Sequence, residues 1–334
     1  MLLKLAKANS RAVKVFFYSS IFLALLFFNS CKQTQANGLT DDGKYKVVAS
    51  TGMIGDLAAK IGGDKVKVDV LVGHGLDPHL YTPSRNDSIK MQSAALVLYN
   101  GLKLEGKMES TLEKAAKKAN VVAVCSWSEG SDYELLGNAE HPDPHVWMDV
   151  QAWSKSAKTV LTSLIELSPE NRETFESNFA AFEKELTELD QYARESIASI
   201  PENARILVTA HDAFGYLGRA YGIEVRGIQG ISTESEAGLK DIENLVELIV
   251  SRKIPAIFTE ASVSDRNVKA LVEGAAARNQ KVVVGGELLS DSMGASGTYE
   301  GTYLGMIDHN VTTLTIALGG KASPKGWKGK LSTH

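Results

Sequence analysis

A long helical pattern in the middle of the chain, residues 168–200, constrains the fold more than any other feature. Apolar side chains recur there at spacings of four and three, at Phe175, Phe179, Phe182, Leu186, Leu189, Ala193 and Ile197, as on one face of an α-helix. Ser168 is an N-cap candidate, Pro169 suits the first helical position and Pro201 ends the pattern. At 1.5 Å per residue the helix is about 45 Å long. It is either a coiled-coil partner or a strut between two domains.

The sequence on both sides of this helix favours the strut, because short apolar strands alternate there with helices. Strands are expected at 45–50, 66–72, 94–99 and 121–125, and again at 206–209, 225–228, 256–259 and 282–284. Intervening helices of 10–15 residues indicate parallel βαβ units. At 334 residues the chain exceeds one ordinary domain and fits two. The predicted fold class is α/β, with two lobes of mainly parallel sheets flanked by helices and joined by one long rigid helix.

The predicted domain organisation places an N-terminal lobe at 45–167, the linking helix at 168–200 and a C-terminal lobe at 201–334. Residues 1–31 have the composition of a secretory signal peptide, with a basic start, a short apolar core and Ser30 before Cys31. Cys31 resembles the cysteine of a bacterial lipobox, which is lipidated after cleavage. The alternative is an uncleaved N-terminal anchor. The polar residues 32–44 read as a tether.

Charge and cysteine content narrow the class of protein further. The net charge of −4 does not indicate the basic surface that is typical of a nucleic-acid-binding protein. If Cys31 carries lipid, the second cysteine, Cys125, has no intramolecular partner. Its apolar surroundings in 121–125 indicate a small buried side chain. We therefore expect an exported globular protein without disulfides.

The tripeptide Asp-Pro-His occurs twice, at 77–79 and 143–145. Proline fixes its own φ and keeps the preceding residue out of the helical region. Each copy is therefore a stiff loop that holds one imidazole, His79 or His145, in a fixed direction. Both copies fall within the first lobe, so they supply only one half of any site between the lobes.

Two further side chains complete a candidate metal site. Ligands of open α/β sheets bind beyond the carboxyl ends of the strands. His79 and His145 follow strands of the first lobe, and His211 and Asp291 follow strands of the second. Three imidazoles and one carboxylate suit a divalent first-row metal ion. Glu260 ends another strand and is a candidate for holding one of these ligands in place.

Each of these residues also has an ordinary interpretation. A lone loop histidine is usually a polar surface group, and Asp291 could cap a turn. The i, i+4 spacing of His141 and His145 is coincidental, because the intervening prolines rule out a helix. The remaining histidines, His74, His309 and His334, are treated as surface groups, with His74 the most suited to approach the cleft. The joint position of the four candidates, two per lobe, favours the metal site.

Four segments together resemble the TroA-like metal-specific solute-binding proteins of ABC transporters: DPHLYTPS, DPHVWMD, TAHDAFGYLGRAYG and GGELLSDSMG. The resemblance covers residues 47 to about 318. It implies two α/β lobes joined by one rigid helix, with His79, His145, His211 and Asp291 as the ligands of a metal between them. The third ligand is often glutamate in manganese or iron binders and histidine in many zinc binders and in some mixed ones. Here it is His211, while the histidine-rich loop of many zinc-specific members is missing.

The expected function is therefore capture of Zn²⁺ or Mn²⁺ outside the cytoplasmic membrane and delivery to an ABC permease with its cytoplasmic ATPase. The metal is the transported ligand and not a catalytic cofactor, and the protein is expected to be a monomeric periplasmic or cell-surface lipoprotein, not an enzyme. A secreted zinc hydrolase is the first alternative. It would need an open metal position and a general base such as Glu260, and the chain has no HExxH or GxSxG. A surface adhesin on the same scaffold is the second.

Overall fold

The computed structural model describes residues 38–138 and 140–332 of the chain. The first lobe contains one sheet in the order β2-β1-β3-β4, and every pairing is parallel. Its strands are β1 (Tyr45–Thr51), β2 (Val66–Val72), β3 (Leu96–Tyr99) and β4 (Asn120–Ala123). Val47 and Ala49 face one buried cluster, whereas Val48 between them faces another. The sheet is thus covered on both faces, as its apolar strands predict.

The helices of the first lobe are α2 (Gly52–Gly62), α3 (Arg85–Ser93), α4 (Glu109–Ala115) and α5 (Val150–Leu167). The sequence pattern predicts a helix over 105–118, but α4 is shorter because Glu105 has another role. Its buried carboxylate accepts the backbone N–H groups of Asn100 and Gly101, at 2.7 and 3.3 Å, and the Ser50 hydroxyl at 2.6 Å. These bonds fix the turn after β3, so the helix begins four residues later.

The second lobe is built from parallel strand pairs, β5 with β6 and β7 with β8. The strands are β5 (Ile206–His211), β6 (Glu224–Gln229), β7 (Ala256–Glu260) and β8 (Val283–Leu288). The helices are α7 (Gly215–Tyr221), α8 (Leu239–Arg252), α9 (Arg266–Ala277) and α10 (Tyr303–Ala317). His211 is the last residue of its strand. The sequence pattern predicts a helix over 212–221, which in the structure begins only at Gly215. The predicted α/β class with mainly parallel sheets is confirmed.

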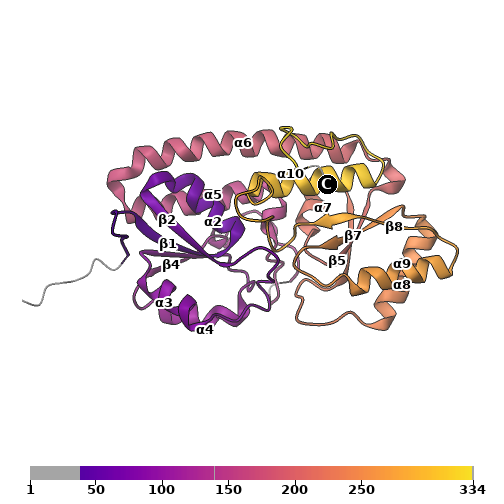
Figure 1. Cartoon of the computed structure of the whole chain (residues 1–334), viewed down its shortest axis with the longest axis horizontal. Coiled ribbons are helices and arrows are strands. Elements are labelled where there is room, and N and C mark those ends of the chain that lie inside the picture. The colour runs from indigo at the N-terminus through magenta and orange to yellow at the C-terminus, as the bar shows by residue number, and fades with distance from the viewer. Residues whose placement is uncertain (1–37, 139, 333–334) are drawn as a thin grey trace, which may run out of the picture. The chain divides into compact units, whose positions relative to one another are not determined.

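The long helix α6 (Arg172–Ala198) runs along both lobes, at the top in Figure 1, and packs on α2 and α5 of the first lobe and on α7 and α10 of the second. The predicted apolar stripe is buried, although Phe179 is only partly so. Ser168 and Pro169 occupy the predicted N-cap and first positions, but they do so in a 3₁₀ turn before the helix and without a side-chain cap bond. A 3₁₀ turn, Pro169–Asn171, precedes the helix, and the Ser168 hydroxyl donates to Glu170 at 2.5 Å instead of capping the backbone.

Helix α10 joins the lobes a second time. Its first backbone N–H, at Tyr303, donates to the Asp56 carboxylate of α2 at 3.0 Å, and the Tyr303 hydroxyl donates to the Trp147 carbonyl at 2.8 Å. At its other end α10 lies close to β8: a Cβ built on Gly285 would stand 2.8 Å from the Ala317 side chain. One apolar cluster consequently runs through α2, α6 and α10.

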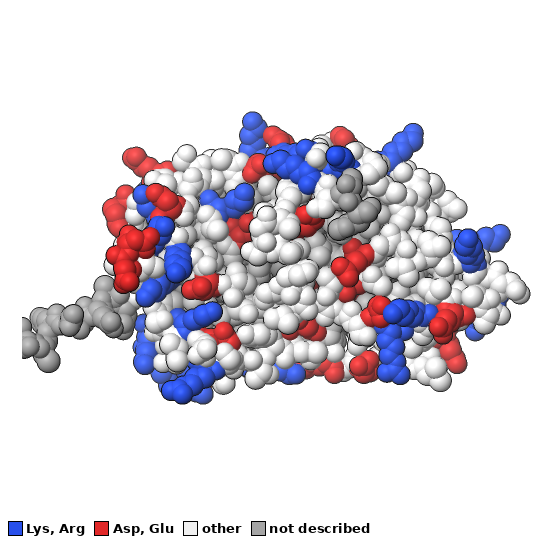
Figure 2. Space-filling model, viewed as in Figure 1, with Lys and Arg blue, Asp and Glu red and all other residues white. Residues whose placement is uncertain are grey.

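The start of the described chain belongs to the first sheet. Gly38 bridges to Ala94 and Leu39 to Tyr45, so this part of the predicted tether is paired with the lobe. The predicted signal peptide and Cys31 lie outside the described residues. Within the described ranges no helix is both long enough and apolar enough to cross a membrane. Acidic and basic side chains are interspersed on the face shown in Figure 2.

Candidate metal centre

The four predicted ligands come together at one buried point. The side chains of His79, His145, His211 and Asp291 each offer one ligand atom, and these atoms lie within 4.8 Å of one another. In the part of the chain that is described, no other group of three or more histidine, cysteine or acidic side chains is brought together in this way. The structure therefore unites two residues of the first lobe with two of the second.

All three imidazoles turn their Nε2 atoms toward the Asp291 carboxylate. The distances are 3.2 Å from His145 to Oδ1, and 3.1 Å from His211 and 3.7 Å from His79 to Oδ2. Asp291 is 1 % exposed, and its oxygens accept no well-directed hydrogen bond from the described residues. The lone pairs of the three imidazole nitrogens and of the carboxylate therefore point into one space. Nitrogen and carboxylate ligands of this kind are those that a divalent first-row metal ion prefers.

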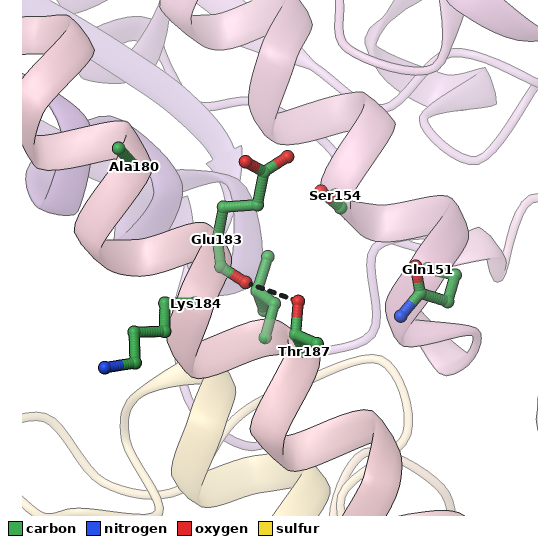
Figure 3. Close-up of a pocket in the computed structure, with 7 residues that line it drawn as sticks. Gln151, Ser154, Ala180, Glu183, Lys184 and Thr187 are labelled. Carbon is green, nitrogen blue, oxygen red and sulfur yellow. Dashed lines mark hydrogen bonds between the residues drawn. The ribbon is translucent and has the colours of Figure 1, made fainter.

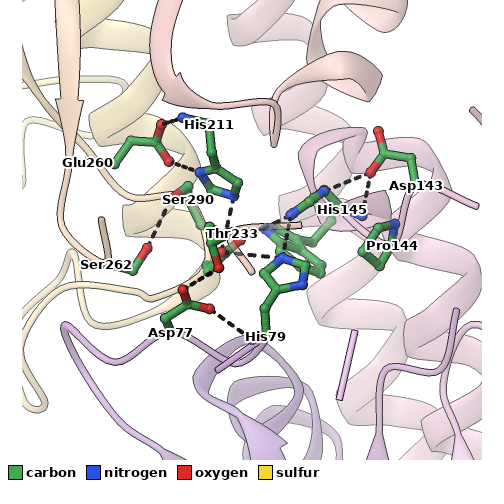
Figure 4. Close-up of polar contacts among 12 residues, drawn as sticks. Asp77, His79, Asp143, Pro144, His145, His211, Thr233, Glu260, Ser262 and Ser290 are labelled. Carbon is green, nitrogen blue, oxygen red and sulfur yellow. Dashed lines mark hydrogen bonds and ion pairs between the residues drawn. The ribbon is translucent and has the colours of Figure 1, made fainter. Parts of the chain in front are cut away.

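The repeated Asp-Pro-His loops hold their histidines through the aspartates. Asp77 Oδ1 accepts the backbone N–H of His79 at 2.8 Å, and Asp143 Oδ1 accepts that of His145 at 2.9 Å. Each is a side-chain turn two residues long, which proline rigidifies at the central position. The Asp143 oxygen also lies 2.7 Å from His145 Nδ1 (Figure 4). An ionised carboxylate can only accept, so Nδ1 carries the proton and Nε2 faces the centre.

Glu260 does the same for His211. Its Oε2 lies 2.6 Å from His211 Nδ1, and its Oε1 accepts the His211 backbone N–H at 2.8 Å (Figure 4). Both residues stand at the carboxyl ends of their strands, β5 and β7, which are neighbours in the lobe. The imidazole is thereby fixed in the tautomer that presents Nε2 to the centre.

The loops that carry ligands from the two lobes are also tied to each other. The buried Trp147 indole donates to the Ser290 carbonyl at 2.9 Å, beside Asp291. The Tyr216 hydroxyl of α7 donates to the Asp143 carbonyl at 2.9 Å. His74 Nδ1 lies 2.8 Å from the Met293 carbonyl. His145 and Asp291 are consequently held in place from both lobes at once.

The charged groups of the site shift the pKa values of the ligands, and so affect which protons a metal ion has to displace. Burial lowers the pKa of His145, but the Asp143 and Asp291 carboxylates outweigh it and raise the pKa to about 9. Burial also lowers the pKa of His211, but the Glu260 and Asp291 carboxylates outweigh burial and raise this pKa well above its usual value. The pKa of Asp291 falls well below normal, because His211 and His145 outweigh the effect of burial. These shifts favour imidazolium–carboxylate pairs in the metal-free centre, so we expect metal binding to release protons.

The pKa of His79 is shifted in the opposite direction. Burial lowers it and outweighs the attraction of Asp291. His79 is also the most exposed of the four, at 5 % against 0 or 1 % for the others. It is the ligand nearest to solvent, and its pKa is lowered whereas the pKa values of His145 and His211 are raised.

A separate hollow in the described part of the chain does not contain a comparable set of groups. It lies between α5 and α6 (Figure 3), with a volume of about 280 Å³, and is lined by Gln151, Ser154, Ala180, Glu183, Lys184, Leu186 and Thr187. A single acid and a single base there give no metal-binding cluster. Reasoning from the sequence singled out all four converging residues and Glu260, and missed the role of the loop aspartates, Asp77 and Asp143. The repetition of Asp before Pro-His was the signal that could have identified them.

Comparison with known proteins adds an independent line of support. Residues 47–317 match the family described as zinc-uptake complex component A, periplasmic (ZnuA). Over 300 residues the chain is 41% identical to the manganese-binding lipoprotein MntA of Bacillus subtilis, covering 90% of this chain and 98% of that protein. It is 46% identical to the zinc-binding protein TroA of Treponema pallidum over 288 residues, covering 85% and 93%. The solved TroA structure superposes with a TM-score of 0.80 and covers 83% of this chain and 99% of that one.

Proposed function

The chain belongs to the zinc-uptake complex component A family, and from that premise we propose that it is the metal-capturing component of an ABC transporter. It binds Zn²⁺ or Mn²⁺ outside the cytoplasmic membrane and delivers the ion to a permease driven by a cytoplasmic ATPase. The observation that supports this most directly is the convergence of three imidazole Nε2 atoms on the Asp291 carboxylate. One relative is named for manganese and another for zinc, so both ions are proposed as cargo.

His79, His145, His211 and Asp291 are the proposed ligands. Three neutral imidazoles, one carboxylate and a divalent ion sum to a charge of +1, and Asp143 and Glu260 compensate it from behind two of the rings. Four protein ligands fill a tetrahedral shell and leave no open position for a reacting water. Glu260 is engaged by His211 on both oxygens and is therefore not free as a general base. We accordingly propose binding without catalysis and do not favour the hydrolase.

The proposal also includes attachment to the membrane through a lipid on Cys31 and a monomeric state. The similarity to a named lipoprotein supports the first, and a ligand set supplied by one chain supports the second. Mass spectrometry of protein from its host should find a lipid-modified N-terminus that a Cys31→Ser variant lacks. Light scattering should give the mass of one chain.

The decisive experiment is titration of chelator-stripped protein with Zn²⁺ and with Mn²⁺. We expect one ion per chain and a higher melting temperature, because the metal binds only the folded state. His211→Ala should abolish the rise in melting temperature. His309→Ala is the matched control, since His309 is partly exposed on α10, lies outside the ligand set, and has its one side-chain hydrogen bond among the described residues with the Glu287 carbonyl. A melting curve that neither metal changes would refute the proposal.

A further inference from the structure

One surface groove leads to the metal centre, and His79 is the only one of the four ligands that lines it. The groove has a volume of about 330 Å³. Besides His79, its second-lobe wall is formed by Ile231, Ser232 and Glu234, and its first-lobe wall by Leu102, Lys103, Leu104, Gly106, His141, Pro142 and Pro144. His145, His211 and Asp291 lie behind His79 and are 0 to 1 % exposed. An ion that reaches or leaves the centre through this groove therefore passes His79.

Beside His79, a hydrogen bond links the His79 loop to the 231–234 segment of the second-lobe wall. The Thr233 hydroxyl donates to Asp77 Oδ2 at 2.5 Å, while Asp77 Oδ1 accepts the His79 backbone N–H at 2.8 Å (Figure 4). Both oxygens of one carboxylate are thus used, one to hold the His79 loop and one to tie it to the second lobe. Thr233 is 9 % exposed, between two groove-lining residues. A bond to a charged acceptor in such a place is stronger than a neutral one.

The His79 loop carries two exposed apolar side chains. Leu76 and Leu80, on either side of His79, are 46 % and 43 % exposed. Two cross-lobe contacts hold the start of this loop, one between His74 Nδ1 and the Met293 carbonyl at 2.8 Å and one from the Gly75 N–H to the Ser292 hydroxyl at 3.2 Å. The bond from Thr233 to Asp77 is the cross-lobe tie that lies next to His79 itself.

We propose that Thr233 is a positioning residue for metal release: its hydrogen bond to Asp77 keeps the groove closed over His79 and sets the rate at which the bound ion leaves. The inference rests on the proposed function, and it adds that release occurs at the His79 side. Opening requires this bond to break, so that the His79 loop and the 231–234 segment separate while His145, His211 and Asp291 stay in place.

The experiment compares Thr233→Val with Thr233→Ser in the full chain. Valine keeps the shape and removes the hydroxyl, whereas serine keeps the hydroxyl. After loading with Zn²⁺, excess chelator is added and the release of the ion is followed by stopped flow. We expect release from Thr233→Val to be at least about tenfold faster than from the unaltered protein, because one hydrogen bond to a charged group is lost. Release from Thr233→Ser should stay within about twofold of the unaltered protein.

Thr187→Val is the matched control, because Thr187 bonds only to the Glu183 carbonyl within α6, at 3.0 Å, and lines the separate hollow of Figure 3. Its release rate should not change. All variants should still bind one ion, which separates this inference from the proposed function: failure of the unaltered protein to bind refutes the latter. If valine disturbs folding, as thermal unfolding of the metal-free variants would reveal, Thr233→Ala carries the same expectation. Equal release rates from folded Thr233→Val or Thr233→Ala and the unaltered protein would overturn the inference.

Discussion

At the scale of single residues, the centre depends on carboxylates that do not belong to the proposed ligand set. Asp143 and Glu260 each contact a histidine twice, once at the backbone N–H and once at Nδ1. They select the tautomer and strengthen the imidazole as a donor to a metal. Their removal should therefore weaken binding although the proposed ligands remain.

Glu260→Gln tests whether the carboxylate behind His211 strengthens metal binding. The amide oxygen can still accept, but the negative charge behind His211 is lost, so metal affinity should fall by about 10- to 100-fold. Competition with a chromogenic chelator measures the change. Glu287→Gln is the control, since Glu287 is exposed on β8, and an equal loss of affinity in both variants would contradict the prediction.

The sequence alone was sufficient to predict the converging residues because each follows a strand whose carboxyl end faces the same cleft. It was not sufficient to predict the cross-lobe bonds. That Thr233 meets Asp77, or that Tyr216 meets the Asp143 carbonyl, depends on how two lobes approach each other. No periodicity within one segment contains that information.

At the scale of elements, the strands and helices follow the hydrophobic pattern closely, and the departures have local causes. Helix α4 begins late because Glu105 is used to fix a turn, and Ser168 bonds to a neighbouring side chain instead of the helix backbone. The close approach of α10 to β8 was also invisible in the pattern. It depends on the missing side chain of Gly285, which only the packed structure reveals.

Gly285→Ala should accordingly destabilise the fold. The added methyl group would lie 2.8 Å from both the Ala317 Cβ and the Phe258 ring, and overpacking of this kind costs about 1–3 kcal/mol. Urea denaturation measures the free energy of unfolding. Gly106→Ala is the control, since a Cβ there meets no other atom within 4 Å, and a destabilisation as small as that of this control would contradict the packing argument.

At the scale of the whole molecule, the lobes share a core, although the sequence predicts them as separate domains. A single apolar cluster includes Leu57 of α2, Leu189 of α6 and Tyr303 of α10. The predicted domain boundaries stay a prediction, but folding of the lobes should be coupled through this cluster. Such a frame favours local loop movements over wide hinge closure.

Calorimetry of the metal-free protein should therefore record one unfolding transition, with equal calorimetric and van't Hoff enthalpies. Saturation with metal should move that transition upward without splitting it. Two resolved transitions, of which only one responds to metal, would show that the lobes unfold independently.

The position of Trp147 offers a way to measure metal binding by fluorescence. Its ring centroid lies 5.1 Å from that of His145, and its indole N–H is bonded beside Asp291. A protonated imidazole quenches the fluorescence of an adjacent indole, and a metal ion on the same ring removes the proton. We therefore expect the fluorescence of Trp147 to rise when metal binds, so that binding can be followed at low protein concentration without a label.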